Sequence, residues 1–433
     1  MKVQSAKLAL YILLLAVLPL LSLSSCGVLE VDIERPATQE TITLPPPTNT
    51  IPAPTKTPLP GQLEPGQAVR IIQIHMLNRT TGWAIGQVET DLNDHILFTT
   101  DGGQSWQDHT PLEALLNPPA EGLAATTFFG ADGNAWVIYA SQSPQQPIQE
   151  KQAVWHTADN GKSWQAGRTL SLSGFQAEYF IPSNLGFLDE QHGWVMAHVG
   201  AGMSHDYIVV FTTSDGGQTW QRVVDADKNP DLMGCSKTGL AFSIATNGWL
   251  TGNCPGLMDH LFLYSSIDGG QTWQPGNIFP PTDQPADLFS DGKAGCGVPD
   301  LIYVTARSTL LTMRCEFYNT KRTVAWLYVG KAGGTLEAHL LPTPFGAFDF
   351  IDTEEGWMVG TQQDDPATPG EIYHTIDGGQ SWTLVLSTAW QGTPDFIDSN
   401  TGWVVAHASD KLALVFTNNG GKLWEKLSPV ITR

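Results

Sequence analysis

Basic residues are scarce in this chain of 433 residues, which has 22 Lys and Arg against 43 Asp and Glu. Four of the basic and five of the acidic residues lie before residue 68, so the remainder carries 18 against 38, a net charge of −20. Such a surface repels phosphate groups. We therefore expect no nucleic-acid partner and no domain that lies flat on anionic lipid.

The apolar run at residues 8–23, LALYILLLAVLPLLSL, is short for a membrane span. Lys2 and Lys7 precede it and LSSC follows at residues 23–26, an order typical of a secretory signal. The pattern resembles the lipobox of bacterial lipoproteins, which implies a signal peptide over residues 1–25 and a diacylated N-terminus at Cys26. The alternative is an ordinary signal peptide with a chance cysteine. We expect an extracytoplasmic protein that is anchored to the cell membrane by its lipid.

Large apolar side chains are scarce in the next segment, residues 26–67, which is rich in Pro and Thr. Such a segment cannot bury a core of its own. In the polyproline II conformation it would rise by about 3.1 Å per residue, which gives a reach of roughly 100 Å. We interpret it as a linker that holds a folded domain away from the membrane.

No helical period of usable length follows residue 68; instead, one octet recurs. It reads TTDGGQSW at residues 99–106 and TIDGGQSW at residues 375–382. Its gaps are 58, 56, 53, 109 and 42 residues, so a degenerate seventh copy is expected in the doubled gap, where YVGKAGGTLE has Ala332 in the Asp place. The six clear copies place the third residue of the octet at Asp101, Asp159, Asp215, Asp268, Asp377 and Asn419.

A second motif, Gly-Trp in five copies and Ala-Trp at residues 135–136, runs in phase with the octet and lies upstream of each clear copy. Each repeat therefore predicts four short strands: a before the Gly-Trp, b starting with it, c leading into the octet and d after it. Four strands at a period of roughly 45 to 55 residues indicate a β-propeller blade. We predict an all-β fold, a single seven-bladed β-propeller over residues 68–433, and a monomer. The Trp positions are Trp83, Trp136, Trp194, Trp249, Trp357 and Trp403.

The octet is expected to shape the turn between strands c and d. The Asp carboxylate can accept hydrogen bonds from its own turn, and Gly supplies positive φ without strain. A calcium loop is disfavoured, because the carboxylates needed at alternate positions are missing. The octet resembles the Asp-box, or bacterial neuraminidase repeat, which implies a structural role on the side of the propeller away from the functional site.

Cysteine is also scarce, with four residues after Cys26. Two pairs share the same spacing of 19 and equivalent positions in neighbouring repeats. Outside the cytoplasm such pairs should oxidise, each joining strands a and b of one blade. A zinc site would need closer ligand spacing and adjacent His. We therefore predict two disulfides, Cys235–Cys254 and Cys296–Cys315, and no metal or other cofactor.

The order of strand a, GW-x-x-G and T-x-DGG-x-S/T-W resembles that of the photosystem II stability/assembly factor-like propellers. The resemblance covers roughly residues 68–433 and implies a seven-bladed, non-enzymatic propeller. Family members that bind reaction-centre subunits use an arginine-rich surface, whereas Arg does not cluster here. We therefore expect a non-enzymatic binding or assembly scaffold, whose partner is an unidentified protein or glycan at the cell surface.

The alternative is a glycosidase of the sialidase type. That chemistry needs three Arg around a carboxylate, a Tyr–Glu nucleophile pair and an Asp acid. MRCEFY brings Arg314, Glu316 and Tyr318 close together, but no second or third Arg lies at a matching place. Other Asp-box glycosidases use two carboxylates across a cleft, and the sequence leaves that class open.

The strand order places the b–c loops and the d–a connections on the face opposite the octets. These are the long, irregular segments, and loops on a rigid scaffold commonly carry function. Trp390 has no predicted place in the core, and an exposed Trp with acidic neighbours suits a cationic or hydroxyl-bearing partner. We interpret the His residues there as solvated residues at strand ends rather than metal ligands. The candidate residues are Trp390, His198, His205, Asp206, Asp259, His260, Asp364, Asp365, His407 and Asp410.

Overall fold

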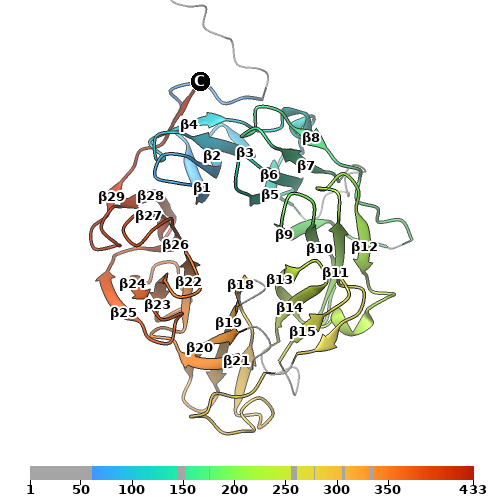
Figure 1. The fold of residues 1–433 in the computed structure, drawn as a ribbon, viewed down its shortest axis with the longest axis vertical. Coiled ribbons are helices and arrows are strands. Elements are labelled where there is room, and N and C mark those ends of the chain that lie inside the picture. Colours follow the sequence, from blue (N-terminus) through green and yellow to red (C-terminus); the bar gives the residue numbers. More distant parts are fainter. Residues whose placement is uncertain are drawn as a thin grey trace, which may run out of the picture. The chain divides into compact units, whose positions relative to one another are not determined.

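The computed structural model describes residues 61–143, 152–174, 176–254, 261–276, 278–304, 308–331 and 336–433. These residues belong to one compact unit, in which seven antiparallel sheets surround a common axis (Figure 1). The predicted all-β fold and the predicted number of blades are confirmed. None of the helices in the described residues has the length and apolar character that crossing a bilayer would need.

Each blade is numbered in chain order, and strand a is its innermost strand (Figure 1). Blades 1 to 3 consist of β1 (Arg70–Met76), β2 (Gly82–Val88), β3 (Asp91–Thr99), β4 (Ser105–Asp108), β5 (Leu123–Phe129), β6 (Ala135–Ser141), β7 (Val154–Thr157), β8 (Gln165–Ala166), β9 (Ile181–Phe187), β10 (Gly193–Gly202), β11 (His205–Thr213) and β12 (Gln221–Val224). Two short 3-10 helices, η1 (Leu112–Leu115) and η2 (Pro230–Leu232), lie in connections between blades.

Blade 5 departs from the simple pattern, because its strand a is divided into β17 and β18, which both pair with β19. The remaining strands are β13 (Ser236–Ile244), β14 (Asn247–Asn253), β15 (Leu263–Ser266), β16 (Gln274–Pro275), β17 (Ala294–Gly297), β18 (Leu301–Val304), β19 (Ser308–Phe317), β20 (Arg322–Lys331), β21 (Leu336–Leu340), β22 (Phe345–Phe350), β23 (Gly356–Thr361), β24 (Glu371–Thr375), β25 (Thr383–Ser387), β26 (Gln391–Phe396), β27 (Gly402–Ala408), β28 (Lys411–Thr417), β29 (Glu425–Lys426) and β30 (Val430–Thr432).

The recurring octet forms the turn between strands c and d, as its composition predicts. In blade 1 the Asp101 carboxylate accepts hydrogen bonds from the Thr99 hydroxyl and the Ser105 backbone N–H, both at 2.9 Å. Gly102 and Gly103 have φ of 77° and 89°, a region that favours glycine. The octet is therefore a self-contained hydrogen-bonded turn. Equivalent contacts recur at Asp159, Asp215, Asp268, Asp377 and Asn419.

The last copy predicts how the turn responds to substitution. Asn419 uses one amide oxygen for the two bonds that Asp makes elsewhere, at 3.0 Å to Thr417 and 2.9 Å to Leu423. We therefore expect Asp377→Asn to lower the free energy of unfolding by less than about 1 kcal/mol, and Asp377→Ala by about 1–3 kcal/mol, because Ala leaves these donors without a partner. Urea unfolding of both variants measures the difference. If the Asn and Ala variants lost equal amounts of unfolding free energy, the hydrogen bonds of the Asp377 carboxylate would not be what stabilises the turn.

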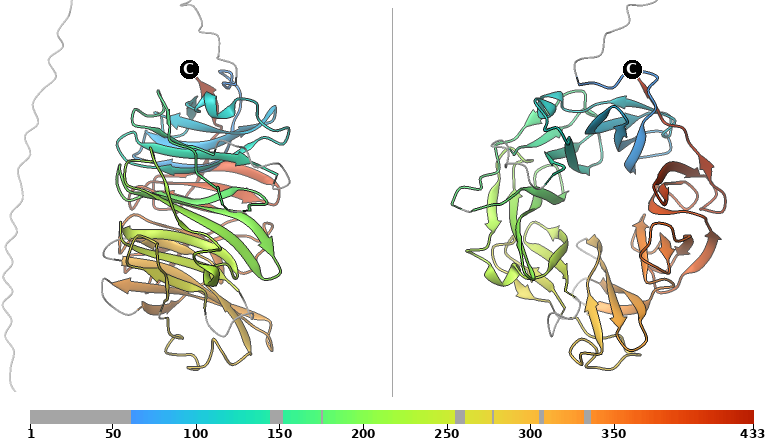
Figure 2. Two further views of the ribbon diagram at one scale, coloured as in Figure 1. Left: turned by 90° about the vertical axis from the view of Figure 1, so that its right-hand side faces the viewer. Right: turned by 180° about the vertical axis from the view of Figure 1, so that it is seen from behind.

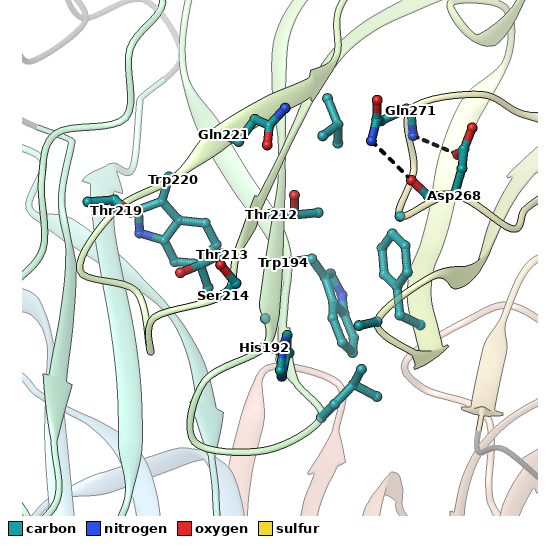
Figure 3. Close-up of a pocket in the computed structure, with 16 residues that line it drawn as sticks. His192, Trp194, Thr212, Thr213, Ser214, Thr219, Trp220, Gln221, Asp268 and Gln271 are labelled. Carbon is teal, nitrogen blue, oxygen red and sulfur yellow. Dashed lines mark hydrogen bonds between the residues drawn. The ribbon is translucent and has the colours of Figure 1, made fainter.

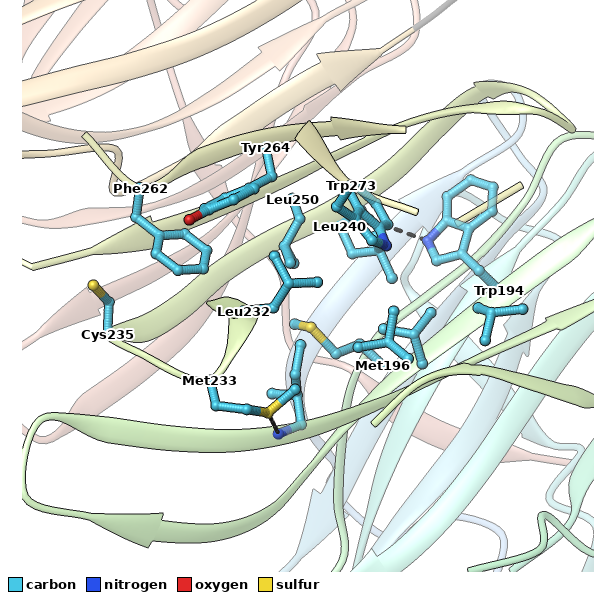
Figure 4. Close-up of a cluster of buried hydrophobic side chains, with 14 of the residues drawn as sticks. Trp194, Met196, Leu232, Met233, Cys235, Leu240, Leu250, Phe262, Tyr264 and Trp273 are labelled. Carbon is cyan, nitrogen blue, oxygen red and sulfur yellow. Dashed lines mark hydrogen bonds between the residues drawn. The ribbon is translucent and has the colours of Figure 1, made fainter. Parts of the chain in front are cut away.

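The hydrophobic core consists of seven clusters among the described residues, one between each pair of adjacent blades. Figure 4 shows the cluster between blades 3 and 4, in which Met196 and Trp194 meet Leu240 and Leu250. Since no blade has a core of its own, each blade is stabilised by both neighbours. The ring must therefore be closed for blades 1 and 7 to bury their apolar faces.

Two disulfides join strands a and b within blades 4 and 5. Their Cα–Cα distances are 5.1 Å for Cys235–Cys254 and 4.1 Å for Cys296–Cys315. The predicted pairing is confirmed. Each disulfide lies at the end of the strand pair away from the a–b turn, where it holds the open end of the hairpin together.

The ring is closed by the C-terminal strand, which the sequence analysis did not predict. Strand d of blade 7, β29, has two residues, and the chain continues to β30, which pairs in parallel with β4 at the outer edge of blade 1. Ile431 donates a 2.9 Å hydrogen bond to Gln67 and accepts one of 2.8 Å from Gly66. The view from behind shows this strand, in dark red, reaching the blue strands of blade 1 (Figure 2).

Candidate functional site

The two faces of the ring differ in their connections. In blade 1 the N–H of Gly102, in the octet, donates a 2.8 Å hydrogen bond to Thr80 in the a–b turn. Equivalent bonds join these turns in blades 2, 3, 4, 6 and 7. We name this side the box face. The b–c loops and d–a connections lie on the opposite side, which we name the loop face.

A groove of about 870 Å³ opens on the loop face between blades 7 and 1. Its walls come from the start of β1, the β2–β3 turn, β28 and the chain that leads into β30. Exposed Arg70, Glu89 and Lys426 supply charges of both signs, and Leu92, which is 57% exposed, supplies apolar surface. We name it the seam groove, because the ring closes beside it.

A buried ion cluster lies next to the seam groove. His95 is fully buried, with its Nε2 3.1 Å from Asp91 and its Nδ1 3.3 Å from Asp108. Burial alone would lower the pKa of His95, but the hydrogen bonds and charges of both carboxylates outweigh it and raise that pKa. Asp108 also accepts the backbone N–H of Leu63 at 2.9 Å. Through Asp108, His95 therefore helps to join the incoming chain to blade 1.

The candidate residues of blade 3 form a network with blade 4. His198 Nδ1 lies 2.8 Å from Asp206 Oδ1, and the other oxygen of Asp206 accepts the Lys237 backbone N–H at 2.9 Å. The Lys237 ammonium donates to three backbone carbonyls, including that of Cys235 at 2.9 Å. Burial lowers the pKa of Lys237 to about 8, although the charge of Asp206 opposes the shift. His205 is exposed at the tip of the β10–β11 hairpin. His198, Asp206 and Lys237 thus hold two blades together.

A second group of candidate residues gathers over blades 6 and 7. The b–c loop of blade 6 contains Asp364 and Asp365 and contacts the hairpin of blade 7, where the Ser409 N–H donates to Pro366 at 3.1 Å. Asp410 lies in the same hairpin, and His407 is paired with Gln391 across the strands. The structure thus separates the predicted residues into two groups, one on blade 3 and one on blades 6 and 7. Asp259 and His260 lie outside the described residues.

Trp390 is half-buried rather than an exposed platform. Its ring packs edge-on against Trp424 with centroids 5.7 Å apart, and it joins the cluster between blades 6 and 7. Its backbone carbonyl accepts the N–H of Gly370 at 3.1 Å. This packing gives Trp390 a place at the edge of the core between blades 6 and 7, where the sequence predicted none.

Three titratable residues on consecutive inner strands form a cluster that the sequence analysis missed. Asp395 on β26 accepts the N–H of Met76 at 2.7 Å and lies 3.5 Å from the Nδ1 of His75 on β1. Asp349 on β22 accepts the N–H of Phe396 in the same way. Burial, followed by the charge of Asp395, raises the pKa of Asp349 to about 7. Each carboxylate thus joins its blade to the next, and the signal was the repeated Asp in FDFID and PDFID.

The residues of the sialidase alternative serve other contacts. Arg314 on β19 lies over the Phe345 ring of blade 6, with its guanidinium carbon 4.5 Å from the centroid. Glu316 and Tyr318 are exposed at the end of that strand. Arg314 therefore packs between blades. Within the described part of the chain, no three His, Cys, Asp or Glu side chains gather closely enough to hold a metal ion.

Comparison with known proteins gives a short sequence match and broad likeness of fold. No protein-family model matches the chain. The chain is 36% identical over 80 residues to the photosystem II assembly lipoprotein Ycf48 of Synechococcus sp. (strain CC9902), and the match spans 18% of this chain and 22% of that protein, about a fifth of its length.

Solved structures resemble the chain over most of its length at low identity. The structure of YCF48 bound to D1 peptide is 17% identical, with a TM-score of 0.46, over 83% of this chain and 94% of that one. A xyloglucanase from Xanthomonas campestris is 12% identical, with a TM-score of 0.49, over 86% of this chain and 55% of that one.

Proposed function

We propose that this protein is a membrane-anchored, extracytoplasmic scaffold that binds another protein through its loop face and catalyses no reaction. The observation that carries the proposal is the seam groove. It is an open trough with Arg70, Glu89 and Lys426 at its rim and aliphatic residues along its wall. Charges of both signs around apolar surface suit a polypeptide, which offers both kinds of group along its length.

The chemistry of the described carboxylates also supports binding over catalysis. A glycosidase of this architecture needs two carboxyl groups that flank a substrate bond. On the loop face, Asp206 is held by His198 and Lys237, and Asp365 accepts an N–H of its own loop at 2.9 Å. The charge of Asp395 helps to raise the pKa of Asp349, but each carboxyl group already accepts a backbone N–H from the next blade.

The short match to a photosystem II assembly lipoprotein is consistent with an assembly role, and we extend that role to this chain as part of the proposal. The partner is a protein at the membrane surface.

Crosslinking in the native cell, followed by identification of co-purifying proteins, tests the binding role. Lys426→Glu reverses a charge at the seam groove, and Lys422→Glu makes the same change in the octet of blade 7 on the box face. We expect partners to be lost with Lys426→Glu and retained with Lys422→Glu. Equal recovery from both variants would remove the seam groove from the interface. Turnover of a sialoside or polysaccharide by the purified protein would overturn the non-enzymatic role.

Membrane anchoring gives a separate prediction. If Cys26 carries the lipid, Cys26→Ala should move the protein from the membrane fraction to the soluble extracytoplasmic fraction, because the variant loses the acyl chains that would hold it at the bilayer. Fractionation and immunoblotting measure this, with Cys26 intact as the reference. An Ala variant that still sediments with membranes would show that the lipobox interpretation is wrong.

A further inference from the structure

A crevice of about 350 Å³ opens on the box face between blades 3 and 4 (Figure 3). The octet turns of both blades and the a–b turn of blade 3 form its walls. Nothing in the proposed function uses this face. The crevice is lined by three aromatic rings, Trp194, Trp220 and Phe242, and its rim is polar.

Of the three rings, Trp220 is half-buried and offers carbon surface, whereas Trp194 and Phe242 are 8% and 3% exposed and present only an edge to the crevice. The indole N–H of Trp220 donates to Gly217 at 3.0 Å, and that of Trp194 donates to Leu240 at 3.1 Å. Because both N–H groups are used within the protein, a ligand meets the rings and not their donors. The electron-rich faces of Trp attract cations, and they also pack against the aliphatic part of a long side chain.

The rim supplies negative charge without a Lys or Arg among the lining residues. Hydrogen bonds from Thr272 lower the pKa of Asp268, so this carboxylate is ionised at neutral pH. Asp268 accepts hydrogen bonds from the hydroxyls of Ser266 and Thr272 and from the backbone N–H of Thr272, all of which are neutral donors.

The neighbouring crevice between blades 2 and 3 is a useful contrast. It is larger, about 760 Å³, and shares Ser214 and Thr219 with the first. However, Arg168 lines it, so a positive charge of the protein already lies there. The crevice between blades 3 and 4 combines aromatic surface with a rim that has no such cation.

We propose that this crevice binds an Arg or Lys side chain from an extended segment of a partner protein. The aliphatic stem would pack against Trp220 and Trp194, and the charged end would meet Asp268 at the rim. Arg fits best, because its planar guanidinium both stacks on aromatic rings and forms paired hydrogen bonds with a carboxylate. This inference rests on the proposed protein-binding function and adds a second contact on the opposite face.

The octet itself provides a matched pair of variants. Gln271 lies at the crevice rim, and its amide donates to the Asp268 carbonyl at 3.3 Å. Gln380 holds the same place in blade 6, donating to Asp377 at 2.9 Å. Blades 2 and 7 already carry Lys162 and Lys422 at this place, so the turn accepts Lys. Gln271→Lys therefore puts a cation into the crevice, and Gln380→Lys makes the same change elsewhere on the box face.

The test uses fluorescein-labelled GRGRGRG and the same peptide with citrulline in place of Arg, titrated with the detergent-solubilised full chain in an anisotropy assay. We expect the Arg peptide to bind more tightly than the citrulline peptide. Gln271→Lys should weaken that binding by about tenfold, and Gln380→Lys by less than about twofold, because only the first places a competing cation at the site. Raising the salt concentration from 50 to 200 mM should weaken it as well.

Equal losses for the two variants would show that the peptide responds only to net charge, and the crevice would be excluded. Equal binding of the Arg and citrulline peptides, or no binding of either, would overturn the proposal in the same way. The result is separable from the proposed function. Co-purification of a partner through the seam groove does not depend on Gln271, so either proposal can fail while the other holds.

Discussion

Replacing Ile431 by Ala is expected to lower the free energy of unfolding by about 2–5 kcal/mol. Ile431 is 1% exposed and belongs to the cluster between blades 7 and 1. It lies at the centre of β30, which pairs with β4 and with the chain before β1. The loss is large because β30 carries the chain from blade 7 into the sheet of blade 1, so a cavity there weakens the burial of both blades.

Ile267→Ala is the control for that prediction. Ile267 is 79% exposed in the octet of blade 4, so its truncation should change the free energy of unfolding by less than about 0.5 kcal/mol. Chemical denaturation followed by Trp fluorescence measures both variants. If Ile431→Ala were as stable as Ile267→Ala, the C-terminal strand would not be what closes the ring.

Replacing Asp349 by Asn is expected to remove a loss of stability that the protein suffers as the pH rises. The pKa of Asp349 is about 7 in the folded protein, above its ordinary value of 3.8, so the folded state favours the protonated carboxyl. The stabilisation that protonated Asp349 gives the folded state is fully present below about pH 4 and is lost as the pH rises through 7. At pH 8 the free energy of unfolding of the Asn variant should exceed that of wild type by on the order of 2–4 kcal/mol. Near pH 4 the two values should be similar.

His75 also lowers the stability of the folded protein as the pH rises. Burial would lower its pKa, but the hydrogen bond and charge of Asp395, with the charge of Asp349, raise it. A raised His pKa gives stability that is present below the ordinary value of 6.5 and lost as the pH rises through the folded value. Asp410→Asn, an exposed carboxylate on the loop face, is the control. The prediction would be contradicted if the free energies of unfolding of wild type and Asp349→Asn changed in parallel from pH 4 to pH 8.

The sequence predicted the blades because the repeated residues have fixed backbone roles. The Gly and Asp of the octet specify one turn conformation, and the Trp of strand b specifies a contact between blades. These requirements recur in each repeat, so their spacing gives the number of blades. The equal spacing of the four cysteines predicted the disulfides for the same reason, since both pairs occupy the open end of an a–b hairpin.

Other features depend on contacts that spacing does not encode. The strand β30 has three residues, too few for a recognisable pattern, and its partner β4 lies at the other end of the chain. The cluster of His75, Asp349 and Asp395 comes from blades 1, 6 and 7, whose closeness follows from ring closure. Trp390 had a predicted loop position, but its packing partner Trp424 belongs to the next repeat.

Site-specific photo-crosslinking tests whether the seam groove on the loop face binds a protein. Leu92 in the groove and Leu340 on the outer edge of blade 5 are 57% and 56% exposed, so a photoreactive phenylalanine analogue can replace either with similar accessibility. In the native cell, illumination should give a discrete adduct of higher mass from position 92 and none from position 340. No adduct at position 92, or the same adducts at both positions, would contradict the claim.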